Sequence, residues 1–191
     1  MWYKIARGLG KFWFTITHHG VRVHNRELLP EGGAVICPNH TALRDPLYVA
    51  VAMKPSVKMR YMAKAELFES RLLGWFLNSL GAFPVKRGTA DIQAIRESIK
   101  SLNDGCKLVV FPEGTRVTEG KEAEAKGGAA MLAAKTGLPI VPTYISNGRT
   151  FFKRVDVVFG EPIYVGRPRE EQRAAVDKVM TAIEELKCKL K

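Results

Sequence analysis

Hydrophobic and polar positions along this chain follow two different periods, which together predict an alternation of strands and helices. Short β-branched and aliphatic runs predict strands at residues 21–23, 34–37, 57–62, 82–88, 107–111, 140–146 and 155–159. Apolar residues at helical spacing predict helices at residues 2–16, 47–53, 92–102, 127–136 and from 168 onward, and residues 64–80 are predicted to form a loop or a helix. This order favours one α/β domain, residues 21–191, with a mostly parallel or mixed β-sheet flanked by helices.

Two of the predicted helices carry clear signals at their ends. Asp91 precedes one helix as an N-cap, and Gly105 follows its last turn. The final helix starts with Glu170 and Glu171 and ends in lysines, which matches the direction of the helix dipole. These signals locate the helix ends more closely than the hydrophobic pattern alone.

Residues 1–20 are predicted to form a separate N-terminal amphipathic helix. Its apolar face carries Trp2, Ile5, Leu9, Phe12 and Trp13. Basic residues lie off that face, and no acidic residue precedes Glu27. Aromatic residues on one side and basic residues on the other are typical of a helix that lies in a membrane interface. The alternative is a helix that packs on its own domain through the same apolar face.

Composition narrows the classes of partner. The 191 residues include 30 Lys and Arg against 19 Asp and Glu, which gives a net charge of +11. Such a surplus favours nucleic acid, anionic lipid, a phosphorylated substrate or an acidic protein. Nucleic acid fits less well, because the aromatic residues form an amphipathic stripe instead of lying along a basic strand face. We therefore expect an anionic membrane surface as a partner.

Cysteine usage and the lack of long apolar segments indicate the cellular compartment. Cys37, Cys106 and Cys188 lie far apart without a C-x-x-C pair, which argues against a zinc site or a disulfide framework. No apolar run reaches the ~20 residues that a spanning helix requires. No compact apolar segment with a small-residue cleavage site marks a secretory signal. We expect a peripheral protein on the cytoplasmic face of the membrane, without a bound metal.

The candidate chemistry begins where the strand predicted at 34–37 ends. His40 follows this strand, and Asp45 follows His40 by five residues, directly before Pro46. Histidine can accept and donate a proton near neutral pH, and a nearby carboxylate can hold its tautomer. We interpret His40 as a general base and Asp45 as its orienting partner. In the alternative, His40 is a loop histidine and Asp45 caps a helix with Pro46 at its first position.

Other polar residues also follow predicted strands. Ligands of open α/β sheets bind at the carboxyl ends of strands, so we expect His40, Arg87 and residues 113–116 to converge. Arginine binds phosphate through a planar fork, and a base beside Arg87 and Arg116 indicates activation of a hydroxyl on a phosphorylated substrate. The alternative for both arginines is solvated surface charge. Cys37 is predicted to be a small core residue, because buried thiols are poor nucleophiles.

Two of these segments resemble motifs of the glycerolipid acyltransferases, the 1-acylglycerol-3-phosphate acyltransferase family. Asn39-His40 followed by Asp45 is similar to the family's NHx4D motif. Residues 111–116, with the sequence Phe-Pro-Glu-Gly-Thr-Arg, are similar to its FPEGTR block. The resemblance supports the catalytic interpretation of His40, because the motif occurs in the context that it requires.

Three further segments resemble the same family. Residues 81–87 resemble its second block and residues 140–142 its fourth, and residues 64–67 also fit the pattern. The blocks occur in the family's order along the chain. Ala42 is a departure, because the family often has serine two positions after the histidine. This change affects a supporting hydrogen bond and not the base itself.

The resemblance implies a specific reaction. A fatty acyl thioester, on acyl carrier protein or coenzyme A, would donate its acyl group to the 2-hydroxyl of 1-acylglycerol-3-phosphate (lysophosphatidate), giving phosphatidate. His40 would take the hydroxyl proton, and Asp45 would orient the imidazole. The residues implied to bind the substrate are Lys64, Arg87, Glu113, Gly114, Thr115 and Arg116. Val141 and Pro142 would lie along the acyl channel, and no metal or prosthetic group is implied.

Three alternatives to this reaction stay open at the level of sequence. The acceptor could instead be glycerol-3-phosphate or another lyso-lipid, because the motifs do not determine which tail the acceptor carries. Water could replace the alcohol, which would make the protein a thioesterase. A non-catalytic basic protein could bind membranes or nucleic acid through its charge.

Overall fold

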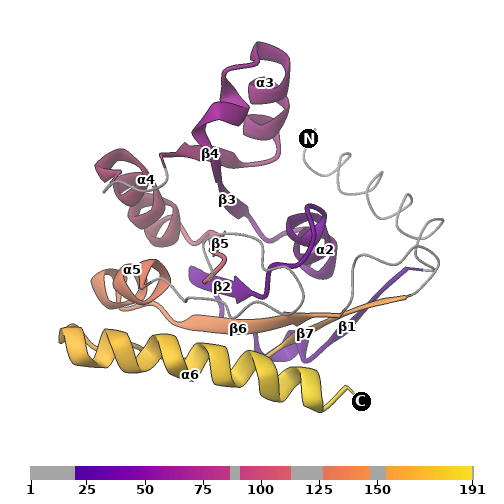
Figure 1. Cartoon of the computed structure of the whole chain (residues 1–191), viewed down its shortest axis with the longest axis vertical. Coiled ribbons are helices and arrows are strands. Elements are labelled where there is room, and N and C mark those ends of the chain that lie inside the picture. Colours follow the sequence, from indigo (N-terminus) through magenta and orange to yellow (C-terminus); the bar gives the residue numbers. More distant parts are fainter. Residues whose placement is uncertain (1–19, 87–90, 113–126, 147–153, 191) are drawn as a thin grey trace.

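The computed structural model describes residues 20–86, 91–112, 127–146 and 154–190. Within these residues the chain forms a seven-stranded sheet with helices on both faces (Figure 1). The strands follow the order β1-β7-β6-β2-β5-β3-β4 across the sheet. Their bounds are β1 Val21–His24, β2 Ala34–Pro38, β3 Met59–Lys64, β4 Ala82–Val85, β5 Lys107–Val109, β6 Ile140–Ile145 and β7 Val155–Phe159.

Strand direction divides the sheet into two parts. Neighbouring strands are parallel throughout the order β6-β2-β5-β3-β4, and β1 is parallel to β7. The β6–β7 pair is antiparallel, with Thr143 opposite Phe159. The strands β2 to β6 therefore end at one edge of the sheet, whereas β1 and β7 run the opposite way. This mixed, mostly parallel sheet confirms the predicted fold class.

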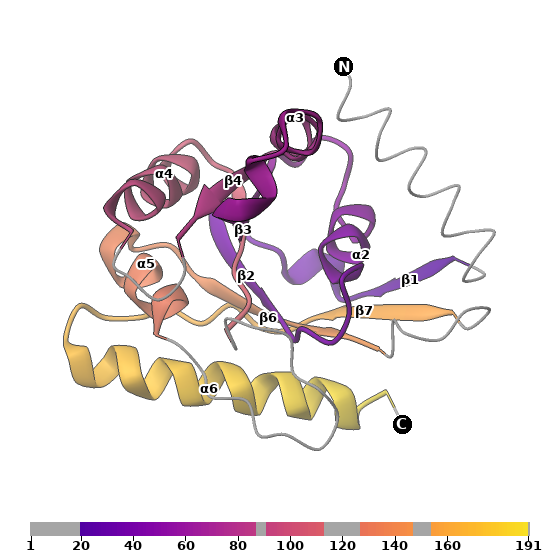
Figure 2. The ribbon, with the colours of Figure 1, turned by 45° about the horizontal axis from the view of Figure 1, so that its top comes forward.

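Helices cover the two faces of the sheet unequally. The helical elements are α2 Asp45–Ala52, α3 Arg71–Ser79, α4 Ile92–Asn103, α5 Gly128–Thr136 and α6 Arg169–Cys188, with the short 3-10 turns η1 Arg26–Leu28 and η2 Ala65–Phe68. Helices α4, α5 and α6 lie next to one another and pack on one face, whereas α2 packs against β1 and β7 (Figure 2). Helix α3 lies with η2 beside β4, at the end of the sheet (Figure 1).

The central strand β2 shows how the two core layers arise from one segment. All of its residues are buried, and successive side chains point to opposite faces. Ala34 and Ile36 belong to the apolar cluster that includes α2. Val35 and Cys37 belong to the cluster that includes α4, α5 and α6. A strand that is buried on both faces has a continuous apolar sequence, which is why this run predicts a strand so clearly.

Several strand boundaries differ from the predicted ones by one to three residues, and β3 and β5 illustrate the causes. Strand β3 begins at Met59 instead of residue 57, because the N–H of Val57 donates to the carbonyl of Lys54 and closes a turn. Strand β5 ends at Val109 instead of residue 111, because the chain leaves the sheet and the Phe111 ring stacks on His40.

The predicted N-terminal helix at residues 2–16 lies outside the described residues. Among the helices that the structure does describe, none combines the length and the apolar character needed to cross a membrane.

Helix α4 begins as predicted, with Asp91 as its N-cap. The Asp91 carboxylate accepts hydrogen bonds from the N–H of Lys86 at 2.9 Å and the N–H of Ala94 at 3.0 Å. These bonds lower the pKa of Asp91 below its ordinary value of 3.8, because they stabilise the charged form. One carboxylate thus ties the residue after β4 to the start of α4.

We expect Asp91→Ala to lower the melting temperature at neutral pH, because both hydrogen bonds are lost. A carboxyl group whose pKa is lowered by folding adds stability above its unfolded-state pKa and loses this contribution as the pH falls through its folded-state pKa. The difference in melting temperature between wild type and variant, followed by circular dichroism, should therefore shrink below pH 3.8. A difference that persists unchanged in acid would show that the charge of this cap is unimportant.

Candidate active site

The loop after β2 is anchored to the end of β6 by Asn39. The Nδ2 of Asn39 donates to the carbonyl of Ile145 at 3.1 Å, and its Oδ1 accepts from the N–H of Ile145 at 2.7 Å. The backbone N–H of Asn39 donates to the carbonyl of Thr143 at 3.3 Å. Asn39 therefore continues the pairing of β2 with β6 through its side chain. The loop that follows is held at the edge where β2 to β6 end.

His40 and Asp45 lie together in this loop. The Oδ2 of Asp45 accepts hydrogen bonds from Nδ1 of His40 at 3.0 Å and from the N–H groups of Thr41 and Ala42, both at 2.7 Å. Because an ionised carboxylate can only accept, Nδ1 of His40 carries a proton, and the lone pair of the neutral imidazole lies on Nε2. The hydrogen bond to Asp45 therefore selects the tautomer that a general base at Nε2 requires.

The alternative interpretation made Asp45 the N-cap of helix α2, but Asp45 does not occupy that position. Arg44 occupies the N-cap position without a side-chain hydrogen bond, and Asp45 is the first residue of the helix, followed by Pro46. The Asp45 side chain is directed back onto the preceding loop, where the N–H groups of residues 41 and 42 are close enough to donate to it. Its other oxygen, Oδ1, is buried and has no hydrogen-bond partner among the described residues. The three donors thus converge on a single oxygen of a fully buried side chain.

An aromatic ring packs on the face of the imidazole. Phe111, which follows β5, stacks on His40 with ring centroids 3.9 Å apart and an interplanar angle of 26°. His40 is only 9% exposed. Phe111 therefore restrains the imidazole at its face, while Asp45 restrains it at the Nδ1 edge. This stack also brings Phe111, the first residue of the segment resembling the FPEGTR block, against the segment resembling the NHx4D motif.

Sequence reasoning assigned no role to Asn39 or Phe111. Their only signal was their position inside the two motifs, since Asn39 directly precedes the histidine and Phe111 opens the second block. Their contacts reach across the sheet to β6 and β2, and such long-range contacts have no trace in local spacing.

The remaining residues predicted to bind substrate are placed only in part. Arg87, Glu113, Gly114, Thr115 and Arg116 lie outside the described residues. Lys86 and Pro112, the described residues that precede them, follow the ends of β4 and β5. Lys64 is the last residue of β3, and its Nζ lies 3.0 Å from Oε1 of Glu66, with both side chains about half exposed. The topology brings these strand ends to the edge that carries His40, and the phosphate-binding role stays a prediction.

The two residues predicted to line an acyl channel lie in β6. Val141 is fully buried in the apolar cluster that includes α2. Pro142 is buried opposite Cys37 of β2, and its carbonyl accepts from the N–H of Gly160. Both precede Ile145, where Asn39 anchors the loop between β2 and α2. Their proposed contact with an acyl chain stays a prediction.

Cys37 is a core residue, as predicted. It is fully buried in β2, and burial raises the pKa of its thiol well above the ordinary value. A neutral buried thiol is a poor nucleophile, so the imidazole is the candidate reactive group in this loop. Within the described ranges, no group of three His, Cys, Asp or Glu side chains could hold a metal ion.

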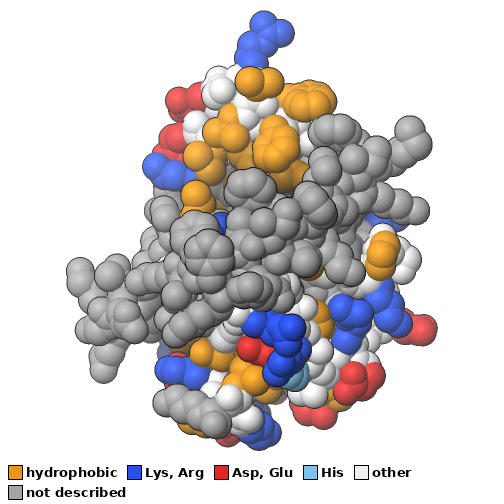
Figure 3. Space-filling view, turned by 90° about the vertical axis from the view of Figure 1, so that its right-hand side faces the viewer, with side chains coloured by type: hydrophobic (Ala, Val, Ile, Leu, Met, Phe, Trp, Pro, Cys, Tyr) orange, Lys and Arg blue, Asp and Glu red, His pale blue; other side chains and the backbone are white. Residues whose placement is uncertain are grey.

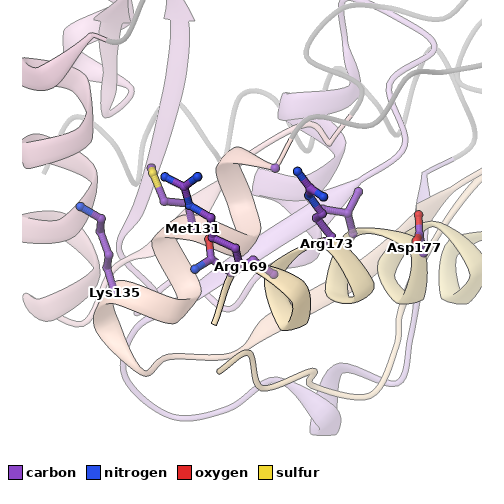
Figure 4. A pocket seen from close by; sticks show the side chains of 8 residues that line it. Met131, Lys135, Arg169, Arg173 and Asp177 are labelled. Atoms are coloured by element: carbon purple, nitrogen blue, oxygen red, sulfur yellow. The ribbon is translucent and has the colours of Figure 1, made fainter. Parts of the chain in front are cut away.

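A separate groove of about 650 Å³ lies between α5 and α6 (Figure 4). Lys135 and Met131 line it from α5, and Arg169, Arg173 and Asp177 line it from α6. None of its lining residues belongs to the loop between β2 and α2. The candidate active site therefore rests on the edge of the sheet and not on this groove.

Known proteins resemble this chain over most of its length. The family profile described as Acyltransferase matches residues 20–146. A 1-acyl-sn-glycerol-3-phosphate acyltransferase of Bacillus subtilis (strain 168) is 35% identical over 182 residues, which cover 90% of each chain. A protein of the same name from Streptococcus pneumoniae is 32% identical over 193 residues, which cover 96% of this chain and 71% of that one.

A solved structure shows the same fold. The crystal structure of the 1-acyl-sn-glycerophosphate (LPA) acyltransferase PlsC from Thermotoga maritima matches with a TM-score of 0.75 and 30% sequence identity. The match covers 97% of this chain and 79% of that one. The profile match runs from the start of β1 to the end of β6 and includes the paired His40 and Asp45. The chain belongs to the acyltransferase family.

Proposed function

We propose that this acyltransferase moves a fatty acyl group from a thioester to the 2-hydroxyl of 1-acylglycerol-3-phosphate, forming phosphatidate. The names of the bacterial relatives support this acceptor. The observation that carries the proposal is the 3.0 Å hydrogen bond between Nδ1 of His40 and Oδ2 of Asp45, at the edge where five parallel strands end. The donor is acyl carrier protein or coenzyme A, which present the same thioester.

His40 acts as the general base in this reaction. Its Nε2 takes the proton of the 2-hydroxyl while the hydroxyl oxygen attacks the carbonyl carbon of the thioester. The tetrahedral intermediate then collapses, the carbon–sulfur bond breaks, and the leaving thiolate takes the proton back from the imidazolium. No acyl-enzyme forms, so the chain needs no nucleophile of its own.

Asp45 stabilises the imidazolium that forms during the attack. The carboxylate is fully buried, so little water screens its charge from the imidazole 3.0 Å away. Its bonds to the N–H groups of Thr41 and Ala42 keep it in place while the proton moves. The transition state thus gains a charge interaction that the neutral ground state of His40 lacks.

The substrate is held by the residues that follow the neighbouring strands. Lys64, Arg87 and Arg116 bind its phosphate, Glu113, Gly114 and Thr115 shape the glycerol site, and Val141 and Pro142 line the acyl channel. Support comes from the direction of β3, β4 and β5, which are parallel and therefore end at the same edge of the sheet. Lys64 ends β3, and Arg87 and Arg116 come after β4 and β5 in the sequence. Phe111 adds to this support, because its stack on His40 ties the start of the 111–116 segment to the base.

The enzyme works on the cytoplasmic face of the membrane as a peripheral protein. The apolar and aromatic face of residues 2–16 lies in the interface, and the net charge of +11 attracts anionic lipid. Neither signal is strong alone, so the two act together.

Purified protein should convert a fatty acyl thioester and 1-acylglycerol-3-phosphate to phosphatidate, identified by mass spectrometry. His40→Ala should lower the turnover by ~10²–10⁴-fold, because general-base catalysis typically contributes that factor. His24→Ala is the matched control: Nε2 of His24 also contacts a carboxylate, Asp156, at 2.8 Å, but in the β1–β7 pair, whose two strands run opposite to β2 and β6. Its turnover should stay at the wild-type level.

Other results of this assay would indicate a different mechanism, acceptor or function. Wild-type turnover in His40→Ala would remove the imidazole from the mechanism. Product from glycerol-3-phosphate or another lyso-lipid alone would replace the acceptor, and acceptor-independent release of fatty acid would indicate a thioesterase. Salt-sensitive binding of anions without acyl transfer would indicate a non-catalytic basic protein.

Asn39→Ala should lower kcat about tenfold and leave KM nearly unchanged, because the loop would no longer hold His40 in register. The two lost hydrogen bonds should also cost about 1–2 kcal/mol of unfolding free energy, measured with urea. Ser146→Ala is the control, because it removes one comparable bond, from the N–H of Asp156 at 2.7 Å. Equal kcat values for the two variants would mean that Asn39 contributes to stability alone.

Removal of residues 2–16 should weaken binding to vesicles of anionic phospholipid more than it lowers the melting temperature. The reason is that this segment is proposed to lie in the membrane interface and not in the core. Co-sedimentation with vesicles measures the binding, and circular dichroism measures the melting. A collapse of the melting temperature would instead show a helix packed on the domain.

A further inference from the structure

The groove between α5 and α6 is lined by three cationic side chains. Lys135 comes from the last turn of α5, and Arg169 and Arg173 come from the first turns of α6. All three are exposed, and Figure 4 shows them along the groove, with Lys135 at one end and Asp177 at the other. Asp177 is the one acidic residue among the described residues that line the groove. The groove therefore carries a surplus of positive charge.

These cations have no acidic partner within the part of the chain that the structure describes. Neither Lys135 nor the two arginines forms an ion pair there. Elsewhere basic side chains lie beside acidic ones, as Figure 3 shows for one face and as Lys187 and Glu184 do in α6 itself, at 2.8 Å. The carboxylate of Glu171 lies against Gly166, before α6, and does not line the groove. Pairing inside the chain therefore does not account for these three side chains.

Folding alone does not favour this arrangement of charge. Arg169 and Arg173 are four residues apart, so their like charges lie on the same side of α6 and repel each other. Arg169 is also the first residue of α6, where the helix dipole favours acidic side chains instead. An anion bound between the two guanidinium groups would relieve both effects. An anionic ligand is therefore the occupant that matches this groove.

The groove also offers apolar surface and the size of a small-molecule site. Met131 and Val176 line it together with the cations, and both pack against the apolar cluster shared by α4, α5 and α6. The volume of about 650 Å³ lies in the range of pockets that bind small molecules and cofactors. These features fit a phosphate group that is joined to an organic chain.

Helix α5 places one end of the groove toward the edge of the sheet that carries His40. It connects the parallel strands β5 and β6, so the chain returns through α5 from the ends of the strands to their starts. Only residues 137–139 separate α5 from β6, and the N–H of Val35 donates to the carbonyl of Pro139. Gly127, which lines the groove just before α5, therefore lies on the side where β2 ends. A Cβ at Gly127 would contact nothing within 4 Å among the described residues.

The two reactants of the proposed reaction differ in where their phosphate lies. In 1-acylglycerol-3-phosphate, the phosphate is on the carbon next to the reacting 2-hydroxyl, so it has to bind close to Nε2 of His40. In the donor, a long and flexible pantetheine arm separates the phosphate from the thioester. Of the two, the donor alone can keep its reacting group at His40 while its phosphate lies in a groove that excludes the loop of His40.

We propose that the groove between α5 and α6 binds the phosphate of the donor's pantetheine arm, and that the arm runs past Gly127 to His40. The three cations bind the phosphate, and the two apolar residues of the groove contact the arm. This assignment rests on the proposed function, because the chain needs a donor only if it transfers an acyl group. Coenzyme A and holo-acyl carrier protein share the phosphopantetheine group, so the same site serves either source.

The test is the binding of coenzyme A and, separately, of holo-acyl carrier protein to the full-length chain carrying Arg169→Gln and Arg173→Gln together. Isothermal titration calorimetry measures Kd. We expect Kd to rise about tenfold, because each lost guanidinium removes charge-assisted hydrogen bonds to phosphate. Lys100→Gln with Lys178→Gln is the matched control, since both lysines are exposed on helices, lie outside the groove and remove the same charge. The control should bind like wild type.

The choice of probes identifies the source of the phosphate. Binding of coenzyme A would identify the soluble thioester as a donor, and binding of holo-acyl carrier protein alone would identify the carrier protein. Pantetheine, which lacks the phosphate, and apo-acyl carrier protein, which lacks the arm, should bind wild type and variant equally weakly. Equally tight binding of the apo- and holo-carrier would overturn the proposal, because the surface of the carrier would then be the ligand. Failure of wild type to bind either donor would overturn it as well.

Kinetics separate this proposal from the proposed function. In the arginine double variant, KM for the thioester should rise about tenfold, while kcat and KM for the acceptor keep their wild-type values. Absence of acyl transfer in wild type would reject the proposed function, and the titration would still test the groove. The groove would be rejected by an unchanged Kd in the double variant or by an equal effect of the lysine control. Weaker binding to vesicles of phosphatidylglycerol with unchanged donor binding would also reject it, because a lipid headgroup would then be the occupant.

The melting temperature shows whether the double variant folds. We expect it to melt no lower than wild type, because the substitutions remove a repulsion between two like charges. If it does melt lower, Lys135→Gln on the other helix is the second variant and should raise Kd in the same direction. Wild-type affinity in Lys135→Gln, with an effect of the arginine pair confined to unfolded protein, would overturn the proposal.

Discussion

One buried oxygen, Oδ2 of Asp45, determines the conformation of the loop between β2 and α2. It accepts from the imidazole and from two successive backbone N–H groups, so the same atom closes the turn and orients the candidate base. Because the carboxylate is fully buried, these bonds compete with no water, and leaving any donor unpaired would be costly. The same hydrogen bonds therefore determine both the conformation of the loop and the orientation of the imidazole.

The sheet supplies the frame for this loop through its strand order. β2 lies between β6 and β5, and residues in or just after each neighbour contact the site. Ile145 at the end of β6 holds Asn39, and Phe111 beyond β5 stacks on His40. Helix-connected parallel strands bring such distant segments to one edge, which is where α/β proteins bind their ligands. The antiparallel β7 takes no part in the described contacts of His40.

Much of the fold could be predicted because local signals agreed with it. The apolar run at 34–37 is buried on both faces, and Asp91 caps its helix through its own side chain. The direction of β7 could not be predicted, since Val155–Phe159 has the same pattern in either orientation. Among site residues, the His40–Asp45 pair was visible from spacing, whereas the bond of Asn39 to Ile145 joins residues 106 positions apart. For α3, periodicity showed which apolar residues share a face but not whether that face is covered.

The stack of Phe111 on His40 has an energetic consequence for the proposed reaction. An imidazole that is held by a carboxylate at one edge and by a ring at its face has lost most of its freedom to rotate. That entropy is given up once, when the chain folds, and not again in every catalytic cycle. The barrier to proton transfer then contains little cost for reorganising the base, and the thermodynamic stability of the folded loop becomes a direct contributor to speed.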